Sequence, residues 1–72
     1  MSALSYMIVP GRGCWTLRHE GYAAGRFSSR EQALREAIGL AKEASGVGHD
    51  AEVVVQDEDG AVRRAFHREH AA

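Results

Sequence analysis

The segment from Phe27 to Gly46 reads FSSREQALREAIGLAKEASG and is the one stretch of this chain with a sustained helical period. At about 100° per residue, counted from Ala33, its apolar side chains fall within an arc of about 160°. These side chains are Leu34, Ala37, Ile38, Leu40, Ala41 and Ala44. The residues on the opposite side are Gln32, Arg35, Glu36, Lys42 and Glu43. The pattern therefore predicts an amphipathic surface helix.

Both ends of this predicted helix carry boundary signals. Ser28 with Glu31, and Ser29 with Gln32, each have the spacing of a capping box, in which two side chains satisfy donors at the helix start. Gly46 can adopt the left-handed conformation that ends many helices. We therefore expect the helix to span residues 28–46.

Before the helix, the sequence predicts a hairpin. Residues 5–9 alternate in the manner of a strand, and Pro10 lacks the N–H that a central strand would need. The glycines of Gly11-Arg12-Gly13 allow the chain to reverse. Residues 14–20 alternate again. Residues 21–25 break the pattern, which leaves 26–27 as a short third strand.

After the helix, the sequence predicts a second hairpin. Residues 51–56 include three consecutive valines, which favour a strand. Asp59-Gly60 is a strong hairpin turn signal, and residues 61–67 form the return strand. The whole chain, residues 1–72, is thus expected to be one α+β domain ordered β-β-(β)-α-β-β, with one mostly antiparallel sheet and a single helix on one face. The ordered core is expected over residues 5–67, with a frayed tail over residues 68–72.

Strand alternation assigns side chains to the two faces of this sheet. The helix-facing set is Ile8, Trp15, Leu17, Val53, Val55, Val62 and Phe66. The opposite set is Met7, Val9, Cys14, Thr16, Arg18, Val54, Arg63 and Ala65. A single helix cannot cover both sides, so the second, half-apolar face is expected to meet a partner.

Size and composition favour the same expectation. A chain of 72 residues buries only about 60% of its extended surface and is marginally stable without additional support. A single cysteine, Cys14, cannot form an internal disulfide, and the Cys and His clusters of a zinc site are missing from the sequence. Oligomerisation is the support that remains. With no leader-like opening and no membrane-length apolar run, we expect a cytoplasmic protein.

The order of these motifs resembles a known family. The motifs are, in order, Tyr6-Met7-Ile8-Val9-Pro10, then Trp15-Thr16-Leu17-Arg18 with Glu20-Gly21, then a Ser-started helix containing Ala33, Ala37 and Ala41, then Val53-Val54-Val55, and finally Asp59-Gly60-Ala61-Val62. This order resembles that of the small bacterial family known as domain of unknown function 2188. The resemblance covers about residues 5–67. It implies the fold described above, no assigned activity and no catalytic residues. Cys14 and Asp57-Glu58 depart from the family pattern, and the second departure makes the hairpin tip acidic. A weaker similarity to HicB-type antitoxins covers residues 6–44.

The sequence offers little for catalysis or cofactor binding. Cys14 and His19 are five residues apart on one predicted strand, which places them roughly 16 Å apart and on opposite faces. His67 and His70 have a helical metal-ligand spacing but no dependable third ligand. We therefore expect no enzyme activity, no metal and no cofactor.

Three functions follow from these observations. The first is a non-enzymatic interaction or assembly module, with a two-fold homodimer as its simplest form, whose interface contains Met7, Val9, Val54 and Ala65. The alternative is a regulatory domain that binds single-stranded nucleic acid through Tyr6, Arg12, Arg18, Arg26, Arg63 and Arg64. The net charge of −1 opposes it, although residues 1–28 and 61–72 each carry an excess of two positive charges. The third is an antitoxin-like partner protein, and none of the three involves a membrane.

Overall fold

A computed structural model describes residues 4–68 of the chain. Its elements are β1 (Leu4–Gly11), β2 (Cys14–His19), β3 (Tyr22–Phe27), α1 (Arg30–Gly46), β4 (Ala51–Gln56) and β5 (Val62–Arg68). The predicted order β-β-β-α-β-β and the α+β class are confirmed. Arg68 belongs to β5, and the rest of the predicted frayed tail lies outside the described residues.

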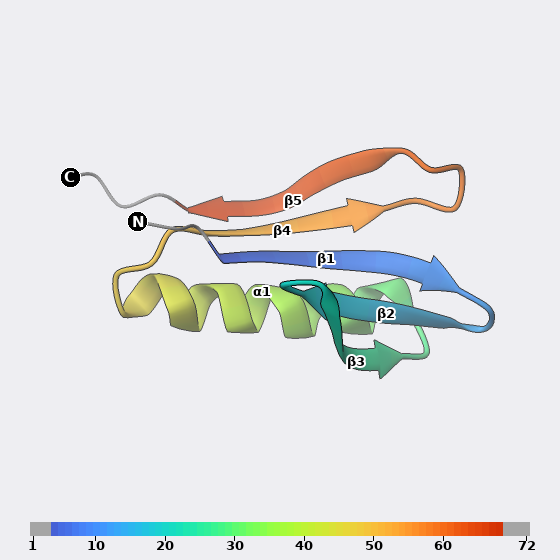
Figure 1. Cartoon of the computed structure of the whole chain (residues 1–72), viewed down its shortest axis with the longest axis horizontal. Helices are drawn as coiled ribbons and strands as arrows, with labels where there is room; N and C mark the ends of the chain where they lie inside the picture. Colours follow the sequence, from blue (N-terminus) through green and yellow to red (C-terminus); the bar gives the residue numbers. More distant parts are fainter. Residues whose placement is uncertain (1–3, 69–72) are drawn as a thin grey trace.

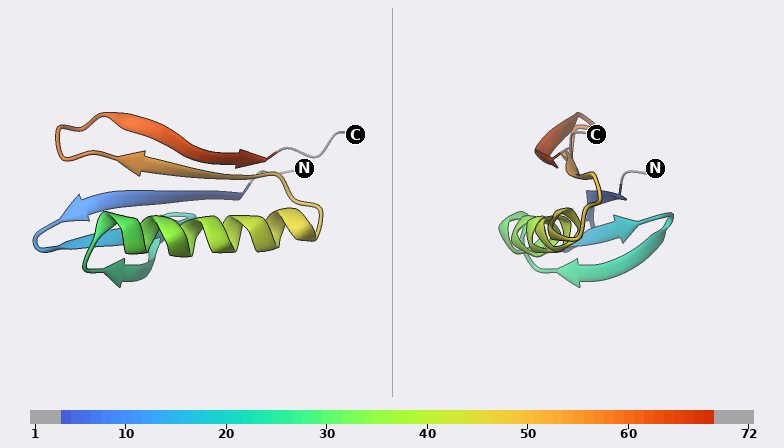
Figure 2. Two further views of the ribbon diagram at one scale, coloured as in Figure 1. Left: turned by 180° about the vertical axis from the view of Figure 1, so that it is seen from behind. Right: turned by 90° about the vertical axis from the view of Figure 1, so that its left-hand side faces the viewer.

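The five strands form one mixed sheet in the order β3-β2-β1-β4-β5. The central strands β1 and β4 are parallel, and all other neighbours are antiparallel. The parallel pair follows from the chain path, because α1 carries the chain back along the sheet before β4 begins. Figures 1 and 2 show α1 lying along one side of the sheet, with its axis close to the direction of the central strands.

The helix begins and ends close to the predicted residues. Ser29 is the N-cap, and its hydroxyl accepts a hydrogen bond from the Gln32 N–H, so Ser29 and not Ser28 caps the helix. Ser28 donates instead to the Gln32 side chain at 2.8 Å. Gly46 is the last helical residue, and the left-handed conformation falls on Gly48, with φ of 100°, rather than on Gly46 as predicted.

The core lies between α1 and the central strands. From the helix it takes a stripe of fully or nearly fully buried alanines, Ala33, Ala37, Ala41 and Ala44. From the sheet it takes Tyr6, Ile8, Leu17, Ala51, Val53 and Val55. Leu34, Ile38 and Leu40 are partly buried along the flanks of the stripe. Small side chains along the centre of the stripe let the helix approach the sheet closely, and the larger ones seal its sides.

Strand β3 is longer than predicted. It spans six residues, because Glu20 and Gly21 adopt positive φ angles of 51° and 88° and close a two-residue hairpin loop. Two successive positive φ angles give the turn whose twist matches antiparallel strands. A register shift between β2 and β3 leaves Ala24 as an extra residue, which explains why the alternation in the sequence was hidden.

Strand β5 contains a β-bulge that corrects two face assignments. Phe66 pairs with Val53 but Arg64 pairs with Val54, so Ala65 is the extra residue. Beyond the bulge, Arg63 pairs with the buried Val55 and lies on the helix side of the sheet. The predictions that Val62 faces the helix and that Arg63 faces away are therefore wrong, because the bulge reverses the alternation between Phe66 and Val62.

The dimensions of the helix explain what it leaves uncovered. An α-helix with its side chains is about 10–12 Å wide, whereas five strands spaced about 4.8 Å apart form a sheet about twice that width. The main contacts of α1 are with β1 and β4. Strand β5 projects beyond the helix (Figure 1), and within residues 4–68 no element covers the opposite side of the sheet.

Candidate functional site

We call the side of the sheet that faces away from α1 the bare face. Its centre is a row across four strands in which Met7 pairs with Arg18 on one side and with Val54 on the other, and Val54 pairs with Arg64. Met7 and Val54 are half-buried by their neighbours, whereas the two arginines at the ends of the row are exposed. The row is apolar in the middle and basic at both ends.

A second row of the bare face is basic at one end only. Val9 pairs with Thr16, and Thr16 pairs with Arg26 on β3. Val9 and Thr16 are half-buried and Arg26 is exposed. The structure thus brings together Met7, Val9 and Val54, three of the four residues predicted to form an oligomer interface. It also places Arg18, Arg26 and Arg64 around them.

Two of the arginines on the rim of the bare face have partners. Arg18 donates to the Gly21 carbonyl at 2.8 Å, which ties β2 to the hairpin turn. Arg64 Nε lies 3.4 Å from Glu52 Oε1, and Ser5 donates to the other oxygen of the same carboxylate at 3.1 Å. These pairs are exposed and contribute little to stability, but they hold the arginine side chains beside the apolar centre.

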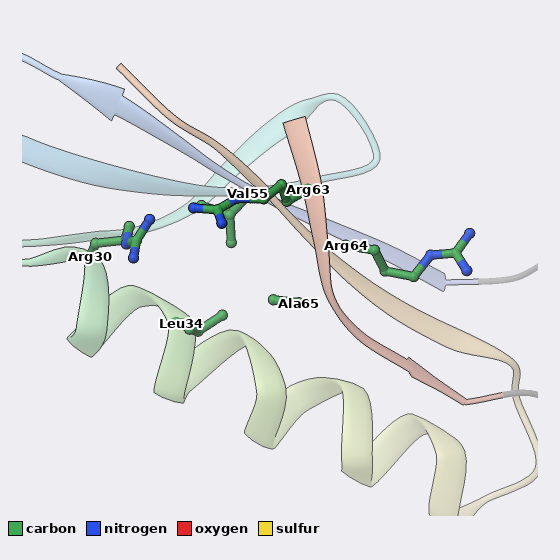
Figure 3. A pocket seen from close by; sticks show the side chains of 6 residues that line it. All are labelled: Arg30, Leu34, Val55, Arg63, Arg64 and Ala65. Atoms are coloured by element: carbon green, nitrogen blue, oxygen red, sulfur yellow. The ribbon is translucent and has the colours of Figure 1, made fainter. Parts of the chain in front are cut away.

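Ala65, the fourth predicted interface residue, lines a groove between α1 and β5 instead. We call this the α1–β5 groove; its volume is about 210 Å³. Its lining residues are Arg30, Leu34, Val55, Arg63, Arg64 and Ala65. Figure 3 shows Arg30 and Arg63 pointing toward one another at one end, while the Arg64 side chain points away.

Asp57 links the two arginines at that end of the groove. It accepts from Arg30 Nη1 at 2.9 Å and from Arg63 Nη2 at 3.1 Å. One carboxylate therefore fastens the first residue of α1 to the end of β4 and to β5, and leaves one positive charge in excess. Asp57 was predicted only as part of an acidic hairpin tip, and neither Arg30 nor this contact was predicted. The tandem Arg63-Arg64 was the available signal. Consecutive side chains of a strand lie on opposite faces, so one of these two arginines has to lie on the helix side of the sheet.

Tyr6 occupies the core and not a binding surface. Its ring is stacked on His19 with centroids 4.5 Å apart, and only 7% of the residue is exposed. Burial raises the pKa of the Tyr6 phenol, and the carboxylates of Glu20 and Glu43 raise it further. In this position the ring of Tyr6 has no free face on which a nucleotide base could stack.

The remaining predicted contacts and candidates are dispersed. Arg12 lies in the exposed β1–β2 turn, and Cys14 is a partly buried free thiol at the far end of β2 from His19. Across the described residues, no group of three or more His, Cys, Asp or Glu side chains could hold a metal ion. His70 lies outside the described residues. No helix in the described part of the chain is long and apolar enough to cross a membrane.

The fold and these surfaces define a small α+β protein in which one helix covers half of a five-stranded mixed sheet. The chain belongs to the family of uncharacterized proteins conserved in bacteria that is designated domain of unknown function 2188, whose model matches residues 6–65. This match confirms the resemblance seen in the sequence. No curated protein matches the chain significantly, and neither does any solved structure.

Proposed function

We propose that this protein is a non-enzymatic assembly module that forms a homodimer through the bare face. The observation that carries the proposal is the contiguous apolar group of Met7 and Val54, which are paired across β1 and β4, and Val9, two residues after Met7 on the same face of β1; no element covers it within residues 4–68. Apolar side chains gathered on one face of a small protein mark an interaction surface more often than scattered ones do.

The area of the bare face suits a weak to moderate dimer. Five strands at about 4.8 Å and six residues at about 3.3 Å give a face of roughly 500 Å². Two such faces bury roughly 1,000 Å² in total, which is near the lower limit for a specific interface. We therefore expect a dimer that dissociates in the micromolar range and not an obligate one.

The central position of Val54 allows a specific test. A Val54→Glu variant places a carboxylate in the middle of the interface, where burial without a partner is costly. In the monomer the new carboxylate faces Arg64 across the strand pair, so the fold itself should tolerate the change. The matched control is Val47→Glu, because Val47 lies at the helix end with 76% of its surface exposed.

Sedimentation analysis from about 1 μM to about 1 mM measures the outcome. The wild-type protein and Val47→Glu are expected to shift from monomer to dimer over this range, whereas Val54→Glu remains monomeric. Circular dichroism on the same samples checks that all three are folded. A folded wild-type protein that stays monomeric throughout, or a dimer that Val54→Glu leaves intact, contradicts the proposal.

Single-stranded nucleic-acid binding is a second candidate for the same face. The observation that favours it is the position of Arg18 and Arg26 on neighbouring strands beside the apolar centre. Against it, Tyr6 is buried, and Arg63 lies on the other side of the sheet. Binding of oligothymidylate that weakens steeply with salt and is lost in Arg18→Gln supports this candidate. The absence of retardation at low salt removes it.

The antitoxin-like role rests on the partial resemblance alone. It predicts a toxin-like reading frame beside this one, and a stable complex when the two proteins are expressed together. A chromosomal neighbourhood without such a frame counts against this role.

A further inference from the structure

The outer edge of β5 is a second place where the fold is open to a partner. β5 stands at the end of the sheet order and has one neighbouring strand, β4. An edge strand presents peptide N–H and C=O groups that can pair with another extended segment. Proteins that bind peptides by strand addition use such an edge together with nearby pockets for the side chains.

The charge of β5 selects the kind of segment that can pair with it. Its seven residues contain Arg63, Arg64 and Arg68 and no acidic residue. Pairing with β5 of a second copy would set arginines against arginines, and like charges on facing strands are destabilising. The same arginines favour an extended segment rich in aspartate or glutamate.

The α1–β5 groove supplies a side-chain pocket beside this edge. Its apolar surface comes from Leu34, Val55 and Ala65, one residue from each of three elements (Figure 3). A volume of about 210 Å³ is below the roughly 300 Å³ at which small-molecule sites begin. The groove therefore suits one apolar side chain and not a cofactor.

The arginines at the mouth of the groove retain binding capacity. Arg30 and Arg63 share the single carboxylate of Asp57, and each guanidinium has five N–H donors. The Arg63 side chain is 70% exposed. An incoming carboxylate can therefore bind to Arg63 without displacing Asp57.

We infer that β5 and the α1–β5 groove bind an extended acidic segment of a partner protein. The segment adds to β5 as a sixth strand, inserts one apolar side chain between Leu34 and Ala65, and pairs a carboxylate on the helix side of the sheet with Arg63. This surface is distinct from the centre of the bare face, so the inference does not rest on the proposed homodimer.

A labelled synthetic peptide tests the inference on the full-length protein. The probe alternates glutamate and threonine around one central leucine, and its binding is measured by fluorescence anisotropy. We expect a dissociation constant of roughly 10–100 μM at low salt, because a short segment must be ordered on binding. Replacing the glutamates by glutamine, or the central leucine by serine, is expected to weaken binding at least about fivefold.

Protein variants with matched controls locate the site. Ala65→Phe fills the groove and should weaken binding at least about tenfold, whereas Ala23→Phe makes the same change on the other edge strand and should have no effect. Arg63→Gln should weaken binding about three- to fivefold, and Arg26→Gln should not. Equal effects of the variants and their controls overturn the inference.

Amide hydrogen exchange distinguishes strand addition from loose electrostatic attraction. Peptide binding should slow the exchange of amides in residues 62–68, because groups on the outer edge of β5 become hydrogen-bonded. Oligothymidylate of similar charge serves as the competing polyanion. If it binds as tightly as the peptide, if exchange in β5 is unchanged, or if the peptide does not bind at all, the inference fails.

Discussion

Replacing Gly39 with alanine is expected to raise the free energy of unfolding by about 0.5–1 kcal/mol. Gly39 lies within α1 on its exposed side, and a Cβ added there would meet no atom within 4 Å. The change therefore makes no new contact and removes only the entropic cost of a glycine inside a helix. For a domain of this size the gain corresponds to a rise of roughly 2–8 °C in the melting temperature.

Urea denaturation followed by far-ultraviolet circular dichroism measures the change in unfolding free energy. A second glycine-to-alanine variant serves as a control with the opposite expected sign. In Gly48→Ala a residue with φ of 100° would acquire a side chain, which is strained there. This variant is expected to lose stability.

Gly39 within the helix has two possible explanations, namely a neutral substitution or a close contact with another molecule. The open space around its Cα supports the first. If Gly39→Ala lowers the stability, or if its effect on stability depends on protein concentration, a partner packs against that side of α1. Such a result would refute our assignment of that side of the helix to solvent.

Three further changes probe the core and its electrostatics. Leu17→Ala should lower the unfolding free energy by about 2–5 kcal/mol in urea denaturation, because Leu17 is 1% exposed under the helix. This loss is a large part of the total unfolding free energy, which is roughly 4–11 kcal/mol for a chain of this length. The raised pKa of Tyr6 means that folding favours the neutral phenol, so this contribution to stability is complete below about pH 10 and is lost as the pH rises through the folded-state pKa. Thermal melts across this range should show a smaller alkaline loss for Tyr6→Phe than for the wild type. Asp57→Ala should cost about 0.5–2 kcal/mol at low salt and less at high salt, while Glu58→Ala stays within about 0.5 kcal/mol.

Local patterns were sufficient to predict most of the fold. The helix, its Ser29 cap and the valine strand each depend on residues within a few positions of one another, and the structure confirms them. Burial of Ile8 and Leu17 on the helix side is also confirmed, because regular alternation continues through both strands.

The wrong predictions, the length of β3 and the faces of two β5 residues, concern features that depend on how one strand pairs with its neighbour. The turn at Glu20-Gly21 lacks the usual Asn-Gly or Asp-Gly signal, so β3 was predicted too short. The bulge at Ala65 is invisible in the sequence of β5, because it depends on how that strand twists against β4. Since the bulge turns Arg63 toward Asp57, the α1–β5 groove could not be predicted from the sequence, whereas the apolar centre of the bare face could.

The positions of the two surfaces predict that they function independently. Val54 faces away from α1, and the α1–β5 groove opens on the helix side, so one partner on each surface can bind at the same time. Ala65→Phe should therefore leave the dimer intact. Val54→Glu should change the affinity for the acidic peptide by no more than about threefold, which allows for the added negative charge near Arg64. Simultaneous loss of dimerisation and peptide binding in either folded variant would show that the two surfaces form a single site.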